Sequence, residues 1–363
     1  MKYNLLTIFF LSLTFSYAQI SQSDFERIVM SYKDSVTNPK YGINCLYQNG
    51  KGEVFYQGIG YADENTLVNR QNIFSIGSLS KTFTAVMILQ DVEDGKISLN
   101  DSLVKRFPEN YVDYPKELPK SITVKELLSH TSGISPSYKD TLNTNEYFNP
   151  YHLTNYELGF NRIPYNKELR GTHSYSNSNY MLLGYILEIV NRKPFYHLLQ
   201  KRIFDKLGME NAYGFYSPTI PNVAQGFLEG TELSPYIFNR YYDKIIASGG
   251  LSMNIDDLNK FLNALYLSEE LLTEDTKNTM FNFDDSYYGL GIMRTTYILR
   301  NQEQRIFVGH NGSTLTSQTL VYYDPKTKES FILLSNTYND KIIDKIFSDL
   351  INLDVNKKLT ADN

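Results

Sequence analysis

FSIGSLSKTFTAVMILQ, residues 74 to 90, contains both a helical run with almost no polar face and the chain's best candidate for chemistry. Residues 74–77 are mostly apolar, and the polar groups of the run from Ser78 to Leu89 are small hydroxyls and one lysine. A helix that is apolar nearly all round must be buried, so this segment predicts a core helix. Ser78 lies at its start, where unpaired N–H groups and the positive end of the helix dipole favour a nearby oxyanion.

The spacing of Ser78 and Lys81 gives this helix a possible reaction. Residues three apart are neighbours on one face of a helix. An ammonium inside a buried helix is costly unless it is paired or loses its proton, so Lys81 is a candidate proton acceptor from Ser78. The alternative is an accidental match, because S-x-x-K alone is a frequent tetrapeptide.

The N-terminus predicts export. Residues 5–15 form an apolar run too short to span a bilayer, and residues 16–18 offer small residues where a signal peptidase cuts. We therefore expect residues 1–18 to be a signal peptide, removed after Ala18, and a periplasmic or secreted protein. The alternative, an uncleaved anchor, needs a longer apolar core. No other stretch approaches about 18 uninterrupted apolar residues, so we expect no stable membrane insertion.

Composition narrows the class of protein. A net charge of −5 and a pI near 5.7 offer no general attraction to nucleic acid. The single cysteine, Cys45, has no disulfide partner and fits a small buried hydrophobe in a strand.

The histidines show no metal-ligand spacing, so we expect neither metal nor cofactor. Those outside the motifs discussed below are His130, His152, His173 and His197. His130 lies in a loop near the expected cleft, and we favour a structural role for it.

The order of helical and strand patterns predicts an α+β protein. Apolar periodicity predicts helices near residues 25–32, 78–93, 123–128, 181–190, 195–207, 258–265 and 340–352. Strands are expected at 41–47, 53–60, 288–296, 305–309, 318–323 and 330–335, the first two forming a hairpin across a turn at 49–52.

These elements suggest two lobes. Residues 19–95 and 285–363 would form one α/β lobe with an antiparallel sheet, made from both chain ends, and residues 96–284 a mainly helical insertion. Residues 135–170 read as a long loop, which in a compact domain is usually functional or disordered.

Two further stretches could complete a site around Ser78. Tyr175 lies at a loop-to-helix junction, where a hydroxyl near positive charge can ionise and take a proton. Gly309 and Gly312 flank the end of an apolar strand, where the backbone can approach a ligand closely and an N–H could serve an oxyanion hole. The alternative interpretations are a core tyrosine and a simple turn.

Together these residues resemble a known family. The chain contains, in order, Ser78-Leu79-Ser80-Lys81, Tyr175-Ser176-Asn177 and His310-Asn311-Gly312. This order of S-x-x-K, Y-x-N and H-x-G is similar to the serine β-lactamase and penicillin-binding protein superfamily, in the branch with class C β-lactamases, D-Ala-D-Ala carboxypeptidases and esterases. The flanking stretches 127–133, 248–251 and 288–291 also look like the family, and the resemblance covers about residues 25–345.

The resemblance implies a β-lactamase/transpeptidase-like fold and roles for three catalytic residues. Ser78 would be the acylated nucleophile. Lys81 and Tyr175 would share the proton transfer, and which of them is the base stays open.

The resemblance also implies substrate-binding residues. Asn177 would bind Lys81 and the acyl amide of a substrate, and the N–H groups of Ser78 and Ser313 would form the oxyanion hole. His310, followed by Gly312, would replace the lysine that faces a substrate carboxylate.

Two departures from the family pattern bear on function. The chain has no glutamate recognisable as the deacylating base of class A β-lactamases, and histidine at 310 is common among the peptidases and esterases rather than dedicated β-lactamases. We therefore expect an exported serine hydrolase acting through an acyl-enzyme on a small amide or ester, such as a D-amino-acid peptide. The alternatives are an esterase of small acyl esters and a non-catalytic binder of cell-wall peptides.

The histidine at position 310 indicates which substrates the protein should prefer. An unperturbed histidine has a pKa near 6.5, and a neighbouring Lys81 favours its neutral form. A free substrate carboxylate would then help without being required, so simple esters would be hydrolysed and common β-lactams poorly. We expect a monomer whose partner is a small molecule or short peptide.

Overall fold

The computed structural model describes residues 20–38, 40–106, 118–135, 163–214, 219–232, 246–283, 286–314, 316–338 and 341–353. The expected signal peptide, His152 and most of the expected loop at 135–170 lie outside these ranges. Within them, no helix combines the length and the apolar character that crossing a membrane requires.

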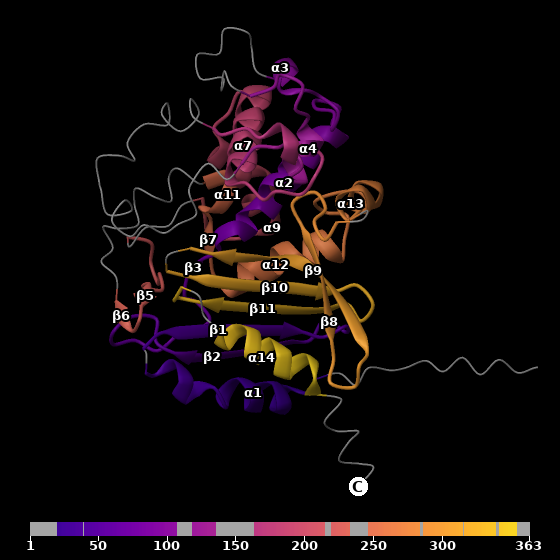
Figure 1. Ribbon diagram of the computed structural model, residues 1–363. Coiled ribbons are helices and arrows are strands. Elements are labelled where there is room, and N and C mark those ends of the chain that lie inside the picture. Colours follow the sequence, from indigo (N-terminus) through magenta and orange to yellow (C-terminus); the bar gives the residue numbers. More distant parts are fainter. Residues whose placement is uncertain are drawn as a thin grey trace, which may run out of the picture.

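A six-stranded antiparallel sheet lies at the centre of the molecule (Figure 1), in the order β2-β1-β11-β10-β9-β8. Its strands are β1 (Gly42–Gln48), β2 (Val54–Gly60), β8 (Met293–Ile298), β9 (Gln304–Ser313), β10 (Gln318–Asp324) and β11 (Glu329–Ser335). Strands from the two ends of the chain meet where β1 pairs with β11. The predicted α+β class is therefore confirmed.

Local chemistry explains the hairpin of β1 and β2. Gln48 pairs with Val54, and the side chain of Asn49 accepts hydrogen bonds from the backbone N–H groups of Lys51 and Glu53. Such bonds from an asparagine to its own turn stabilise the reversal of the chain. The hairpin predicted at these residues is confirmed, and Cys45 is fully buried in β1, as expected.

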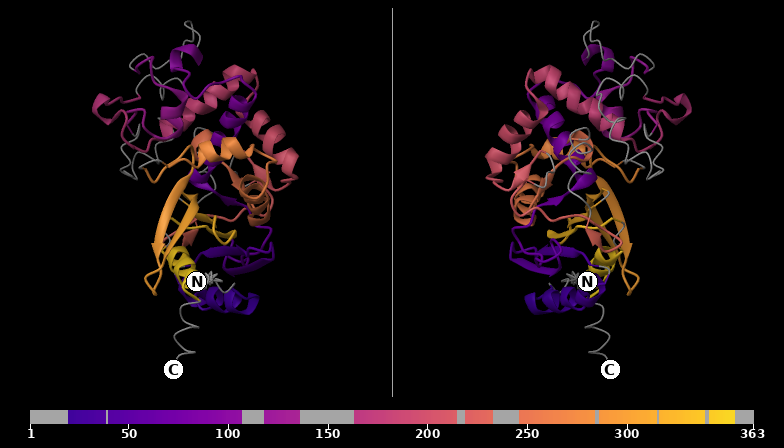
Figure 2. Two further views of the ribbon diagram at one scale, coloured as in Figure 1. Left: turned by 90° about the vertical axis from the view of Figure 1, so that its right-hand side faces the viewer. Right: turned by 90° about the vertical axis from the view of Figure 1, so that its left-hand side faces the viewer.

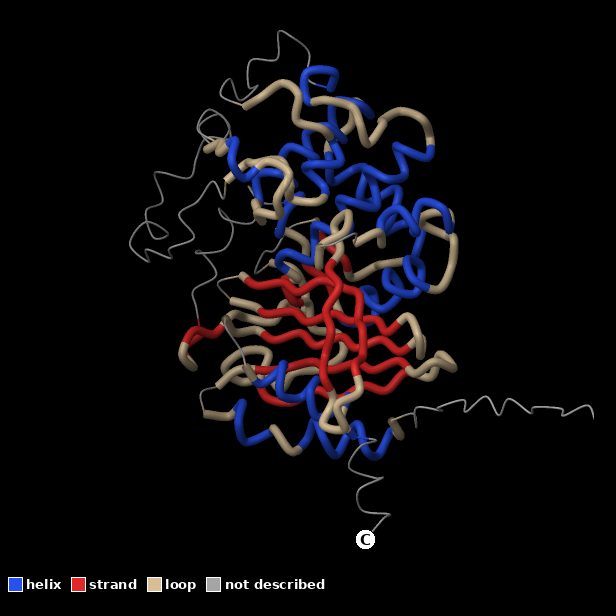
Figure 3. The backbone as a smooth tube through the Cα atoms, turned by 45° about the vertical axis from the view of Figure 1, so that its right-hand side comes forward, coloured by secondary structure: helices blue, strands red, loops and turns tan. Residues whose placement is uncertain are grey.

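The two faces of the sheet carry different helices. Helices α1 (Gln22–Met30) and α14 (Ile342–Ile351) cover one face, where they share a core with Tyr47 and Phe331. Helix α12 (Ile255–Tyr266) packs on the other face against β1 and β11, and Leu46 points to that side. Figure 3 shows the strands lying between these helical layers. Since strand side chains alternate, both faces need an apolar partner.

The helical part lies beyond one end of the sheet, with α4 and α7 far from α1 (Figures 1 and 2). Its helices are α2 (Ser80–Glu93), α3 (Leu103–Arg106), α4 (Val124–Leu128), α7 (Asn177–Asn191), α8 (Phe195–Leu199), α9 (Asp205–Leu207), α11 (Ile246–Gly249) and α13 (Glu274–Met280). Short 3-10 turns lie at Lys33–Val36, Gly77–Leu79 and Lys167–Leu169. Small sheets contain β3 (Phe74–Ser75), β7 (Ser252–Met253), β4 (Ala212–Tyr213), β5 (Phe227–Leu228) and β6 (Thr231–Glu232).

Helix ends follow the sequence signals closely. The helix predicted near residues 123–128 begins with a capping box, in which Thr123 and Glu126 bind each other's backbone. The helix predicted from Phe195 is interrupted by a π turn at Gln200–Phe204 before it ends at Gly208, which adopts a left-handed conformation with φ of 61°.

Two strand predictions near the site were wrong in their bounds. The strand expected from Tyr288 begins only at Met293, because a tight turn through Gly291 (φ 76°) comes first. Strand β9 continues to Ser313, although residues 310–313 were expected beyond the strand end, because β10 pairs with it as far as Ser313. The division into lobes at residues 95 and 285 stays a prediction.

Candidate active site

Ser78 lies on a tight turn between a strand and the buried helix. Strand β3 leads into the 3-10 turn Gly77–Leu79, and α2 follows directly. Ser78 is half-buried in this turn, whereas its neighbours Gly77 and Leu79 are buried. The predicted core helix thus has its N-terminal end at the serine, where unpaired backbone N–H groups cluster.

Lys81 is fully buried and points its ammonium at three oxygen atoms. Nζ donates to Ser78 Oγ at 3.2 Å, to Asn177 Oδ1 at 2.7 Å and to the backbone oxygen of Ser248 at 2.5 Å. An ammonium has three donors, so these acceptors satisfy it. Burying a charge is costly unless it is paired or hydrogen-bonded, so the contacts explain how a lysine is held beside the serine.

Small hydroxyls on α2 hold the segment that supplies Ser248. Ser80 Oγ donates to the carbonyl oxygen of Gly77 and accepts from the N–H of Leu251. Thr84 Oγ1 donates to the carbonyl oxygen of Ala247 at 2.7 Å. The few hydroxyls of this apolar helix therefore bind the segment that contains α11. These bonds place the carbonyl oxygen of Ser248 within reach of Lys81.

Tyr175 and Asn177 approach Lys81 from the start of α7. Ser176 is the N-cap of this helix, and Asn177 is its exposed first residue. The ammonium of Lys81 lies 4.8 Å from the centre of the Tyr175 ring. The three motif residues Ser78, Lys81 and Tyr175 thus come together, although they lie on two segments far apart in the chain.

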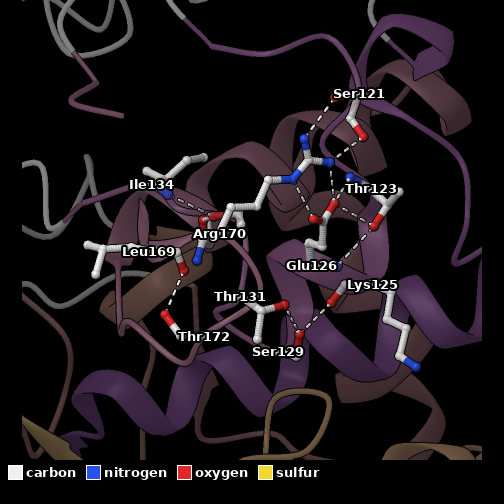
Figure 4. Close-up of polar contacts among 12 residues, drawn as sticks. Ser121, Thr123, Lys125, Glu126, Ser129, Thr131, Ile134, Leu169, Arg170 and Thr172 are labelled. Carbon is white, nitrogen blue, oxygen red and sulfur yellow. Dashed lines mark hydrogen bonds and ion pairs between the residues drawn. The ribbon is translucent and has the colours of Figure 1, made fainter. Parts of the chain in front are cut away.

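An ion pair ties the approach to Tyr175 to helix α4 (Figure 4). Arg170 donates from Nε to Glu126 Oε1 at 2.7 Å and from a terminal nitrogen to Glu126 Oε2 at 3.1 Å, and it also binds Ser121. Burial acts to raise the pKa of Glu126, but hydrogen bonds from Arg170 and Thr123 lower it overall. A two-point contact of this kind sets the direction of the segment that leads to Tyr175.

Strand β9 lies directly against the backbone that carries Ser78. A Cβ added to Gly312 would lie 1.9 Å from the carbonyl oxygen of Ile76 and 3.2 Å from the nitrogen of Ser78. A Cβ added to Gly77 would lie 2.7 Å from the nitrogen of Ser313. Only glycine permits this approach, in which the backbone at Gly312 and Ser313 lies against the backbone at Gly77 and Ser78. Backbone N–H groups can stabilise an oxyanion, so those of Ser78 and Ser313 are the candidates here.

Gly312→Ala tests this arrangement. The new methyl group would collide with backbone, so β9 must shift and the Ser313 N–H must move away from Ser78. We expect kcat to fall about a hundredfold, the usual cost of losing one oxyanion donor. Steady-state hydrolysis, with circular dichroism to confirm folding, would measure this. A folded variant with the wild-type kcat would show that this contact does not set the two N–H groups.

His310 is buried in β9 with both ring nitrogens occupied. Nδ1 lies 2.6 Å from the carbonyl oxygen of Asn311, which can only accept, so Nδ1 carries the proton. Nε2 then accepts a hydrogen bond from the Tyr288 hydroxyl at 3.0 Å. Burial, and next to it the charge of Lys81, lower the pKa of His310 to about 3. In this geometry His310 has no N–H left for a substrate carboxylate, which differs from the expected contact.

Sequence reasoning missed several residues around the site. Tyr288 was noted only as the start of a predicted strand and as part of a stretch that resembles the family, and nothing in the sequence indicated its bond to His310. Aromatic and imidazole rings form a continuous group behind Tyr175; they are His130, His173, Tyr180, Tyr287, Tyr288 and His310. Among the residues that the structure describes, no group of histidine, cysteine or carboxylate side chains could hold a metal ion.

Comparisons with known proteins agree with this architecture. A family model described as Beta-lactamase matches residues 41–345. A protein of Bacillus subtilis (strain 168), described as a candidate penicillin-binding protein PbpX, is 31% identical over 259 residues, which is 69% of this chain and 61% of that protein. The chain thus spans about three fifths of that relative's length. A teichoic acid D-alanine hydrolase of Staphylococcus aureus is 26% identical over 85% of this chain and 74% of its own.

Solved structures show the same fold. D-amino acid amidase from Ochrobactrum anthropi SV3 superposes with a TM-score of 0.75 at 22% identity, covering 92% of this chain and 99% of that one. A D-stereospecific amidohydrolase from Streptomyces sp. gives a TM-score of 0.73 at 22% identity, with coverage of 89% and 97%. At this level of identity the likeness concerns the fold.

Proposed function

The chain belongs to the Beta-lactamase family, and on this premise we propose that it is a serine hydrolase that forms an acyl-enzyme on Ser78. The observation that carries the proposal is the hydrogen bond between the buried Lys81 ammonium and Ser78 Oγ. A protein that only binds peptides has no need to bury a lysine beside a serine, which argues against the binder. The hydrolases among its relatives support the same class of reaction.

The proposed reaction has two halves. Ser78 Oγ attacks the acyl carbon, its proton passes through Lys81 or Tyr175 to the leaving group, and the bond between the acyl carbon and the leaving group breaks. Water then attacks the acyl-enzyme, the acid is released, and Ser78 regains a proton. The N–H groups of Ser78 and Ser313 stabilise the negative oxygen in each tetrahedral state.

Either partner of Ser78 can move the proton in this geometry. Lys81 donates to three acceptors, so it must give up one proton before it can act as the base. The Lys81 ammonium lies 4.8 Å from the centre of the Tyr175 ring, so Tyr175 is the other candidate for the base. Both assignments remain open.

We propose that the substrate is a small ester or amide whose leaving group carries no free carboxylate. The neutral His310 uses its one N–H on Asn311 and its other nitrogen on Tyr288, so the site offers no cation at the position where a lysine would bind a carboxylate. The name of one relative, teichoic acid D-alanine hydrolase, fits a substrate whose leaving group carries no free carboxylate. An ester or amide of a D-amino acid is therefore our first candidate, ahead of D-Ala-D-Ala peptides and β-lactams.

Matched substrates test this specificity. We expect kcat/KM for a neutral D-alanyl ester to equal or exceed that for the same ester with a carboxylate on its leaving group. The ratio should stay constant between about pH 5.5 and 8.5, since a histidine with a pKa far below this range stays neutral throughout. A preference of more than about a hundredfold for the carboxylate-bearing ester would contradict the proposal, because the site would then contribute about 2.7 kcal/mol of carboxylate recognition. Loss of that preference in His310→Ala would identify His310 as its source.

A further inference from the structure

His130 occupies a strained backbone position in the core. Helix α4 ends with the N–H of Thr131 bonded to the carbonyl oxygen of Glu126 and the N–H of His130 bonded to that of Leu127. This double contact requires a left-handed residue, usually glycine, and His130 has φ of 58°. The other described residues with positive φ and a side chain lie on the surface; they are Arg192, Asn222, Glu229, Gln302 and Lys328.

The imidazole of His130 accepts two hydrogen bonds from the segment that carries Tyr175. Nδ1 accepts from the backbone N–H of Ser176 at 3.1 Å and lies 3.0 Å from the side-chain nitrogen of Asn179. Asn179 is oriented by Ser132, whose hydroxyl donates to Oδ1 at 2.8 Å. Because both neighbours are donors, Nδ1 is an unprotonated acceptor. Burial first, and then the nearby Lys81, hold the pKa of His130 well below its usual value, so this form persists.

His130 contacts Tyr175 and both of its neighbours in the chain. The N–H of Ser174, the residue before it, donates to the carbonyl oxygen of His130 at 2.8 Å. The N–H of Ser176, the residue after it, donates to the ring. The imidazole itself lies against the Tyr175 ring, with their centres 4.3 Å apart. A single residue thus holds the chain before Tyr175, the chain after it and one face of its ring.

We propose that His130 is a positioning residue that holds Tyr175 beside Lys81 for proton transfer. The inference rests on the proposed acyl-enzyme reaction and adds a residue to it. The alternative role is to end helix α4, and for that role glycine would serve better than histidine. A histidine at this position costs backbone strain, and its pair of hydrogen bonds to the Tyr175 segment offsets that cost.

Two substitutions separate these roles. His130→Gly relieves the backbone but removes the acceptor and the ring, whereas His130→Asn tolerates the left-handed conformation and keeps an oxygen near the position of Nδ1. The readouts are the rate of Ser78 acylation by a fluorophosphonate, kcat and KM for a simple ester, and circular dichroism. We expect the glycine variant to lose about a hundredfold in acylation rate and kcat with little change in KM, as a misplaced catalytic group causes. The asparagine variant should recover at least about tenfold of that loss.

Each outcome either supports or contradicts the proposed role of His130. A glycine variant that acylates at the wild-type rate, or an asparagine variant no better than glycine, would overturn the inference. If the glycine variant does not fold, Asn179→Leu provides the test, because it removes one of the two donors to Nδ1 and keeps the branching of the side chain. We expect it to slow acylation about tenfold, and an unchanged rate would again overturn the inference. Wild-type protein that is not labelled at Ser78 would overturn the proposed function, and this inference with it.

Discussion

We expect Ser78→Ala to abolish covalent labelling by a fluorophosphonate and to lower ester hydrolysis by at least about 10⁴-fold, the scale seen when a nucleophile is removed from a group that acts as a unit. The reason is that the buried Lys81 ammonium donates a hydrogen bond to the Ser78 hydroxyl, whereas its bond to Ser248 is to the backbone oxygen. The fold should remain, since Ser78 is half-buried and Lys81 keeps its bonds to Asn177 and Ser248. Intact-protein mass spectrometry and circular dichroism measure the two results.

Ser80→Ala is the matched control for this experiment. Ser80 lies two residues away in the same motif, but its hydroxyl is fully buried between Gly77 O and Leu251 N–H. Its loss should lower the free energy of unfolding by about 1–2 kcal/mol, while Ser78 still becomes labelled. Labelling that persists on another serine in Ser78→Ala would remove the central claim about the nucleophile.

Lys81→Met should lower kcat/KM nearly as far as Ser78→Ala, by about 10³-fold or more. Methionine has a similar length and no charge, so the helix keeps its packing and the serine loses its proton-transfer partner. The double variant should be scarcely worse than either single one, because the two residues act in the same step. Stability should also decrease, since Asn177 Oδ1 and Ser248 O each lose the Lys81 donor.

Lys277→Met is the control that separates the loss of activity expected for Lys81→Met from its loss of stability. Lys277 is also buried, but its ammonium binds the carbonyl oxygen of Ser268 and the carboxylate of Glu274. We expect this variant to lose stability and keep hydrolysis, whereas Lys81→Met loses both. Steady-state kinetics and thermal unfolding of both variants would show the contrast. Equal kinetic losses in the two variants would mean that Lys81 matters only for stability.

Short-range signals in the sequence were enough to place many elements. The capping box at Thr123, the hairpin turn at Asn49 and the apolar period of α1 each depend on residues within a few positions of one another. The hairpin and the helices predicted near residues 123–128 and 25–32 are all present, although α1 is Gln22–Met30. The motifs of Ser78, Tyr175 and His310 indicated the family in the same way, because each is a short pattern of residue types.

The contacts that the motif residues make with their surroundings depend on distant parts of the chain. Tyr288 and His310 are 22 residues apart, and their hydrogen bond exists because the turn before β8 folds back against β9. The sequence therefore indicated a neutral histidine but not that both of its nitrogens were occupied.

The same reason explains the remaining differences. Local periodicity ended β9 at Gly309, but pairing with β10 carries it on to Ser313, and contact with the backbone of Ile76 explains the glycine at 312. His130 looked like an ordinary loop residue until the fold brought Ser176 to its ring. The sequence alone indicated which residues could do the chemistry. Only the tertiary structure decided what holds each of them in place, because that depends on pairings that no local pattern encodes.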